Sequence, residues 1–302
     1  QQIAQLFLIL IMGYAVVKAG LLKASDSRVL SVVMVYLVTP CVIINAFQID
    51  DTPEIRKGLL YSMAIAAAIH VVLLVLSALL SRPLKLDAVE QVNVIYSNAA
   101  ALVIPLVKAL MGDAYVIYSC AFIIVQLVLL WTHASSLLQG SSALDWKKVL
   151  TNINMIAIAA GALLYWFRVV LPAPLQNTMS TVGNMMGPMG MLLAGMAIAE
   201  KPLREVFCTC RNYLPTVLRL VVCPLVVLVL LWVCHASSWV ADGKNILMTV
   251  YLAAITPACA TVTSMAQLYD RDAAHSSALY VLTTLLSIVS MPVMIGLFDL
   301  LL

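Results

Sequence analysis

The sequence predicts an all-α polytopic membrane protein, and two observations lead to this fold class. Hydrophobic residues make up 63% of the 302 residues and charged residues only 10%, whereas ordinary soluble domains carry about 25% charged residues. The apolar residues also gather in runs of about 20, the length that a helix needs to cross a bilayer. Short polar clusters separate these runs, so we expect almost no part of the chain to lie outside the membrane.

The polar clusters divide the chain into ten expected transmembrane helices. No loop between them is long enough to fold alone, and no cleavable signal peptide is evident. The ten expected spans cover residues 2–19, 29–49, 58–80, 88–111, 114–138, 148–170, 175–199, 211–234, 244–268 and 273–300.

Lysine and arginine are distributed unequally between the two sides of this predicted bundle. The loops that follow odd-numbered spans hold eleven of the 17 cations, and the opposite side holds five. Because cations mark the cytoplasmic side, we expect both termini to face outward. The remaining cation, Arg219, falls inside span eight, where we expect its side chain to snorkel to the cytoplasmic side near Arg211. The eleven cytoplasmic cations are Lys18, Lys23, Arg28, Arg82, Lys85, Lys147, Lys148, Lys201, Arg204, Arg211 and Arg271.

Composition also argues against several function classes. A net charge of +3 without a basic tail gives no reason to expect nucleic-acid binding. The seven cysteines lack zinc-ligand spacing, so we expect buried free thiols and neither a metal nor a cofactor. No paired acids or histidine-rich run with catalytic spacing occurs, so we do not expect an enzyme.

Three pairs of helix-disturbing residues indicate an internal repeat. Gly13 and Gly161 are 148 residues apart, and Pro40 and Pro188 have the same separation. Pro105 and Pro257, in spans four and nine, are 152 apart. The order of the pairs predicts a five-helix unit used twice, and an odd number of spans per unit makes the two copies inverted in the membrane. Chance is the alternative, since apolar helices contain many glycines.

The third pair of residues, Pro105 and Pro257, predicts a broken helix in each half. Proline lacks an N–H and clashes with the preceding turn, and a broken helix in lipid requires protein or a water-filled cavity around it. Such breaks in corresponding halves point to a transporter's substrate site. A new helix N-terminus carries unpaired N–H groups and a positive dipole end that stabilise an anion. We expect Pro105 to lie in the first turn of the second half-helix of span four.

Five sequence stretches resemble the auxin efflux carrier family, whose bacterial members are carboxylate transporters and which is related to the bile acid, arsenite and riboflavin transporter superfamily. The most specific stretch is the one in span four, which includes the spacing from Asn98 to Pro105. The resemblance covers nearly the whole chain. The stretches are G-Y-A-V-V-K-A-G-L-L in span one, L-V-T-P-C-V-I-I-N in span two, S-N-A-A-A-L-V-I-P-L-V-K-A-L-M-G in span four, the spacing of Pro257, Ala266 and Tyr269 in span nine, and T-L-L-S-I-V-S-M-P in span ten.

The resemblance implies a bacterial-type carrier of the inner membrane that forms a homodimer. Spans four and nine would cross at their broken centres. Spans one, two, six and seven would form a scaffold, and spans three to five and eight to ten a transport domain that moves like an elevator. The two repeats would cover residues 1–138 and 148–302. The long cytoplasmic loop of the plant members is replaced here by a short stretch around Asp145 to Lys148.

The candidate substrate-binding residues cluster around the two expected breaks. Ser97, Asn98 and Pro105 belong to the first; Asn98 and Ser97 either donate to the substrate or satisfy freed carbonyls. Thr256, Pro257 and Thr261 belong to the second, where the hydroxyls either contact the substrate or bond between helices. Lys108 either attracts the anion or snorkels to the interface. The resemblance adds Asn154, because T-N-I-N is similar to an asparagine pair of the family.

Ionisable residues inside a membrane are costly and usually functional. The span map places no acid near a midplane, which argues against a sodium–proton exchanger. His70, at the centre of span three, either couples transport to protons or is a neutral histidine bonded to a neighbouring helix. The same alternatives apply to His133 in span five.

These features favour a secondary transporter that moves a small organic anion, a mono- or dicarboxylate of auxin-like or malate- and malonate-like kind, by alternating access. One alternative is a sodium- or proton-coupled carrier of the bile acid transporter type. The other is a sensor that keeps the fold without transporting.

Overall fold

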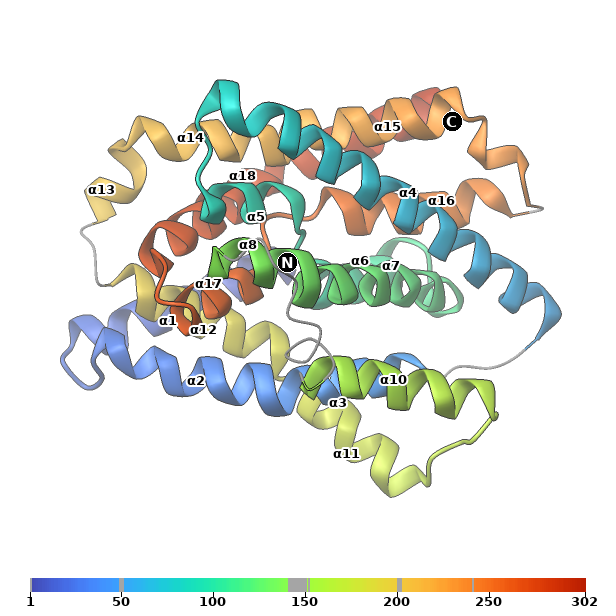
Figure 1. Cartoon of the computed structure of the whole chain (residues 1–302), viewed down its shortest axis with the longest axis horizontal. Helices are drawn as coiled ribbons and strands as arrows, with labels where there is room; N and C mark the ends of the chain where they lie inside the picture. The colour runs from blue at the N-terminus through green and yellow to red at the C-terminus, as the bar shows by residue number, and fades with distance from the viewer. Residues whose placement is uncertain (1, 49–51, 141–150, 152, 200–202, 241) are drawn as a thin grey trace.

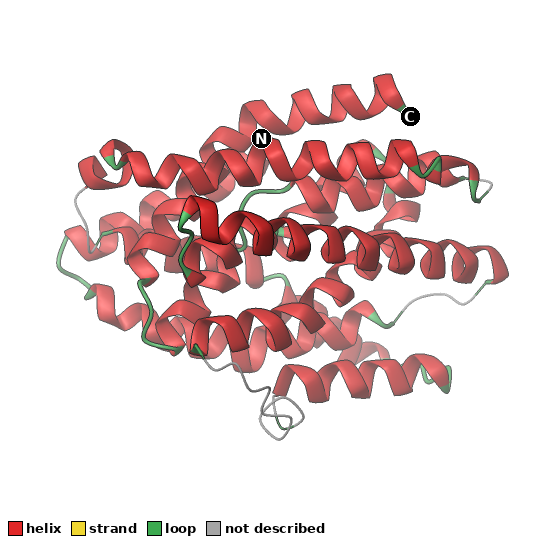
Figure 2. Cartoon of the chain, turned by 45° about the horizontal axis from the view of Figure 1, so that its top comes forward, coloured by secondary structure: helices red, strands yellow, loops and turns green. Residues whose placement is uncertain are grey.

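The computed structural model describes residues 2–48, 52–140, 151, 153–199, 203–240 and 242–302. Every regular element in these ranges is helical, and no strand occurs among them. The long helices lie roughly side by side along the longest axis of the molecule (Figures 1 and 2).

Five helical stretches of the described chain are long and apolar enough to cross a membrane, and they coincide with expected spans two, three, five, eight and ten. The expectation of an all-α polytopic membrane protein is therefore confirmed, while the total of ten spans stays a prediction. The five stretches are Ala24–Asn45, Pro53–Leu84, Val116–Gln139, Cys210–Val233 and Ala273–Leu301.

Two of the long stretches are single helices, and three contain a π-helical segment in the middle. The single helices are α4 (Pro53–Leu84) and α18 (Ala273–Leu301). The others are α2 (Ser27–Val33), η2 (Met34–Val38) and α3 (Thr39–Ala46); α7 (Val116–Leu129), η4 (Leu130–Ala134) and α8 (Ser135–Gln139); and α14 (Cys210–Val217), η5 (Leu218–Val222) and α15 (Cys223–Val233).

The other expected spans appear as shorter helices. Spans one and six are the helices α1 (Gln2–Lys18) and α10 (Ile153–Trp166). Spans four, seven and nine are each divided into two helices. These pairs are α5 (Ala88–Ile95) and α6 (Ala99–Leu110), α11 (Ala173–Gly183) and α12 (Met186–Ile198), and α16 (Gly243–Ile255) and α17 (Ala260–Leu268). The connecting turns include η1 (Ala24–Asp26), η3 (Asp113–Tyr115), α13 (Leu203–Cys208) and η6 (Ala236–Ser238).

A proline follows two of the π-helical segments. Pro40 follows η2 and Pro224 follows η5, each by two residues. In the wider π register the Thr39 N–H bonds the Met34 carbonyl, so the next carbonyl, that of Val35, would need the N–H that Pro40 lacks. The side chain of Asn154 in α10 donates to this carbonyl at 3.2 Å. Pro40 is thus accommodated without breaking the helix.

The glycines that suggested a repeat lie inside unbroken helices. A Cβ at Gly13 of α1 would meet the Leu192 carbonyl oxygen of α12 at 2.3 Å, and one at Gly161 of α10 would meet the Phe47 ring at the same distance. Both glycines therefore permit close helix packing and do not disturb the helix. Pro188, by contrast, lies in the first turn of α12, just after the division of span seven.

The helices gather into two groups. On one side of the molecule α1 packs against α12, and α3 packs against α10 and α11 (Figure 1). On the other side α4, α7 and α18 pack against the pairs α5–α6 and α16–α17. The five largest fully buried side chains, those of Trp131, Arg219, Tyr96, Tyr251 and Tyr280, lie in this second group. The bulkiest part of the core thus surrounds the divided spans four and nine.

Candidate functional site

Two of the three divided spans, four and nine, meet at their breaks. Ser97, between α5 and α6, forms an isolated antiparallel bridge with Ala258, between α16 and α17. The Asn98 N–H donates to the Pro257 carbonyl at 2.7 Å, and the Cys259 N–H donates to the Tyr96 carbonyl at 3.1 Å. We call residues 96–98 and 256–259 the crossing. Each break thereby satisfies part of the backbone of the other.

The first break lies in a different place from the expected one. Helix α6 begins at Ala99, so Pro105 occupies its seventh position and not its first turn. The prediction that Pro105 begins a half-helix is therefore wrong. Pro257, in contrast, lies within the second break. A missing N–H can be absorbed within a helix, whereas a break in lipid requires partners for every freed polar group.

Gln126 of α7 supplies such partners to the first break. Its amide oxygen accepts from the Ser97 N–H at 3.0 Å and from the Ser97 hydroxyl at 2.7 Å. Its amide nitrogen donates to the Ser97 carbonyl at 2.8 Å. In the second break, the Ala258 N–H donates to the Thr283 hydroxyl of α18 at 3.1 Å. Sequence reasoning missed both residues, although a glutamine in an apolar helix was a usable signal.

Arg219 of η5 binds the C-terminal ends of both first half-helices. Its guanidinium donates to the Val94 and Ile95 carbonyls of α5, each at 3.1 Å. It also donates to the carbonyls of Ala254 and Thr256 at the end of α16, the latter at 2.8 Å. The residue is fully buried.

The expectation that Arg219 snorkels to the cytoplasmic side is therefore wrong. The last carbonyls of a helix lack intrahelical partners and carry negative partial charge, so the ends of α5 and α16 provide both acceptors and a favourable field. The π-helical turn that precedes Pro224 contains Arg219. An arginine two turns into an apolar span was the signal that could have revealed this site.

Asn98 lies at the start of α6 and is 3% exposed. Its amide donates to the Tyr280 hydroxyl of α18 at 3.4 Å, and that hydroxyl donates to the Met191 sulfur of α12 at 2.7 Å. Asn98 therefore lies at the N-terminal end of a half-helix and within a polar chain between the two helix groups.

The two candidate threonines flank the second break. The Thr256 hydroxyl donates to the Ala253 carbonyl of its own helix at 3.0 Å. Thr261 is buried in the first turn of α17. The structure thus brings Ser97, Asn98, Thr256 and Pro257 together at the crossing, and Thr261 lies in the adjoining first turn of α17.

Two other candidates are not brought to the crossing by a described contact. The Asn154 amide bonds the Val35 carbonyl of η2, as described above. Lys108 belongs to α6, but its side chain, like that of Pro105, lies outside the described part of the structure. The prediction that these residues bind substrate stays a prediction.

Two histidines lie beside Tyr96. His70 of α4 is fully buried, and its Nδ1 lies 2.7 Å from the Ala66 carbonyl, so this hydrogen bond is within its own helix. Its ring packs 4.7 Å from the Phe122 ring and 6.5 Å from the Tyr96 ring. The His133 Nδ1 lies 3.0 Å from the Tyr96 hydroxyl. Both imidazoles therefore contact the first break through Tyr96.

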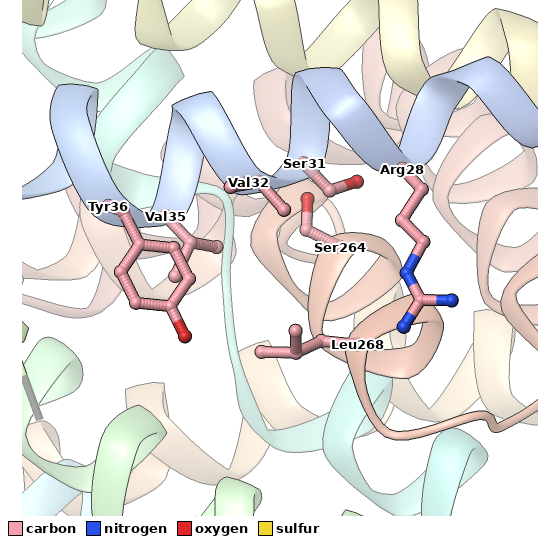
Figure 3. A pocket seen from close by; sticks show the side chains of 7 residues that line it. All are labelled: Arg28, Ser31, Val32, Val35, Tyr36, Ser264 and Leu268. Carbon is pink, nitrogen blue, oxygen red and sulfur yellow. The ribbon is translucent and has the colours of Figure 1, made fainter.

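A shallow pocket lies between α17 on one side and α2 and η2 on the other (Figure 3). The Ser264 hydroxyl of α17 points toward α2, while the guanidinium of Arg28 and the ring of Tyr36 lie at opposite ends (Figure 3). Beside the pocket, the Gln267 side chain of α17 accepts from Ser31 and donates to Ser27, both at 2.6 Å. These bonds tie the second group of helices to α2.

Apolar helices long enough to cross a membrane surround two broken spans, four and nine, that meet in the interior. This arrangement is that of an integral membrane protein of the transporter class. A family model described as "Membrane transport protein" matches residues 1–143 and 138–295. The chain therefore belongs to this family, the auxin efflux carrier family that its motifs resemble. A comparison with curated proteins gives no match.

Proposed function

We propose that the protein is a secondary transporter of a small organic anion, a mono- or dicarboxylate, with its substrate site at the crossing. The observation that carries this proposal is the backbone bridge between Ser97 and Ala258. It brings the N-terminal ends of α6 and α17 to one place inside the protein. Family membership supports transport as the activity.

The helix ends explain how an anion would bind without a lysine or arginine in direct contact with it. The first N–H groups of α6 and α17 have no intrahelical acceptor, and each N-terminus carries about half a positive charge. A carboxylate accepts from such groups. The amide of Asn98 and the hydroxyl of Thr261 lie in or next to these first turns. The inside-negative potential would favour export of the anion by about 2.3 kcal/mol per charge per 100 mV.

We further propose that the ten spans form a 5+5 inverted repeat and that spans three to five and eight to ten move as a transport domain. The side chains that bind the crossing support this division, because Gln126, Arg219 and Thr283 all come from those spans. The scaffold would comprise spans one, two, six and seven, and contacts between the two scaffolds of a homodimer would keep it stationary while the transport domain moves. The polar links to the scaffold, Ser31 with Gln267 and Tyr280 with Met191, would break and reform during the motion.

Uptake of a panel of carboxylates into proteoliposomes tests the proposed function. Asn98→Ala should abolish uptake while the protein still folds, because the amide next to the α6 N-terminus is lost. Asn212→Ala is the matched control, since Asn212 is equally buried at 3% exposure but lies in α14. Near-normal flux in Asn98→Ala would remove this residue from the site.

We propose that His70 is a neutral histidine; proton coupling through it is the alternative, which its contact with the Tyr96 ring makes worth testing. Histidine can change charge near neutral pH, but the ring is fully buried against Phe122, where a charge would need a partner. We therefore expect His70→Gln to leave the pH dependence of uptake largely unchanged. A pH dependence that disappears in this variant, measured with and without a pH gradient, would establish His70 as a coupling residue.

A further inference from the structure

The fully buried cation Arg219 has no role in the substrate site as proposed so far. A buried charge is costly unless it is paired and hydrogen-bonded. No acidic partner of Arg219 occurs among the described residues; its hydrogen bonds go to main-chain carbonyls of two different half-helices. A cation held only by carbonyls remains a net positive charge in the protein interior.

The charges at the crossing can be added to order of magnitude. Each half-helix end carries about half an elementary charge, negative at the ends of α5 and α16 and positive at the starts of α6 and α17. These four partial charges cancel, so the broken helices alone give a neutral crossing. Arg219 adds one positive charge.

We infer that Arg219 is the positioning and specificity-determining residue of this site: it holds the ends of α5 and α16 together and leaves the crossing with one net positive charge, which favours monovalent over divalent anions. The inference rests on the proposed function and narrows its substrate class to monocarboxylates. A dicarboxylate would leave one negative charge uncompensated in a water-poor interior.

The guanidinium suits this role better than other side chains. It has five N–H donors in a planar fork and keeps its charge when buried, whereas lysine has three donors around a point charge. Four carbonyls on two helices lie within reach of the fork. A lysine would keep the charge and lose part of the positioning, and a glutamine would lose the charge.

Two variants separate charge from positioning in proteoliposomes. For a monocarboxylate that the wild type carries, Arg219→Gln should raise KM about tenfold. Arg219→Lys should change KM less than about threefold while lowering the maximal rate, because charge is kept and geometry is not. Thr216→Ala is the control: Thr216 lies one turn earlier, and its hydroxyl bonds the Asn212 carbonyl, away from the crossing. It should leave KM unchanged.

Competition between butyrate and succinate tests the charge count in the wild type, without any variant. At pH 7.5 we expect butyrate to inhibit uptake of the carried substrate at about a tenfold lower concentration than succinate does, because butyrate carries one charge and succinate two. Equal or stronger competition by succinate would overturn the inference. So would a wild-type KM in a folded Arg219→Gln variant, or equal increases in KM for the lysine and glutamine variants.

If the wild type carries no organic anion, the proposed function is contradicted. A disulfide cross-link still tests the positioning role of Arg219 in that case. The substitutions Ser97→Cys and Ala258→Cys, in a Cys259→Ser background, would place two thiols opposite each other across the antiparallel bridge, where the Cα spacing suits a disulfide. We expect efficient cross-linking with Arg219 present and several-fold less in the Arg219→Gln background. Unchanged cross-linking would show that Arg219 does not position the breaks.

Discussion

The two broken helices reach the same geometry by different means. The second break contains Pro257, whereas the first has no proline within it and Pro105 lies seven residues into α6. The first break is instead held by the Gln126 amide, which makes three hydrogen bonds to Ser97. The second receives one side-chain acceptor, from Thr283. Hydrogen-bond partners for the freed backbone groups, and not proline alone, therefore determine where a helix can open inside the protein.

Among the variants at the two breaks, removal of the Gln126 amide should reduce stability and uptake the most. Gln126→Leu leaves the N–H, carbonyl and hydroxyl of Ser97 without their partner, and each unsatisfied buried group costs about 1–3 kcal/mol. We expect a loss of about 3 kcal/mol or more in stability and a complete loss of uptake. Thermal unfolding in detergent measures the first and proteoliposome uptake the second. A melting temperature equal to that of the wild type would show that the first break does not need this residue.

Removing Thr283 should have a smaller effect on the second break. Thr283→Val keeps the shape of the side chain and removes the acceptor of a single N–H group, that of Ala258. We expect a loss of about 1–2 kcal/mol in the same thermal assay. The control variant is Thr263→Val, which alters a buried threonine of α17 that bonds Ser276 outside the break. A stability loss for Thr283→Val larger than that for Gln126→Leu would reverse the comparison.

The smallest effect is expected at Asn154, outside both breaks. Asn154→Ala removes the donor to the Val35 carbonyl, which Pro40 leaves without a backbone partner. We expect a stability loss of about 1 kcal/mol and an unchanged KM, because the residue binds a helix of the proposed scaffold. A KM for the carried anion that rises at least about tenfold, a change of about 1.4 kcal/mol, would instead return Asn154 to the substrate site.

The parts of the fold that the sequence predicts are those that depend on local composition. Apolar runs locate the five long spans, and Pro257 marks the second break correctly. The first break was misplaced because proline signals only its own missing N–H, while the partners of Ser97 come from a distant helix. Arg219 was misplaced for the same reason: the carbonyls that bind it are 35 to 125 residues away in sequence. Long-range partners of freed backbone groups are invisible to local patterns.

We propose that an organic anion binds where α6 and α17 begin. The most direct measurement is a crystal structure with a bromine-substituted form of a carboxylate that the protein carries, located by its anomalous signal. We expect bromine density at the crossing, next to Asn98 and Thr261. Density only in the pocket between α2 and α17, near Arg28, would contradict it.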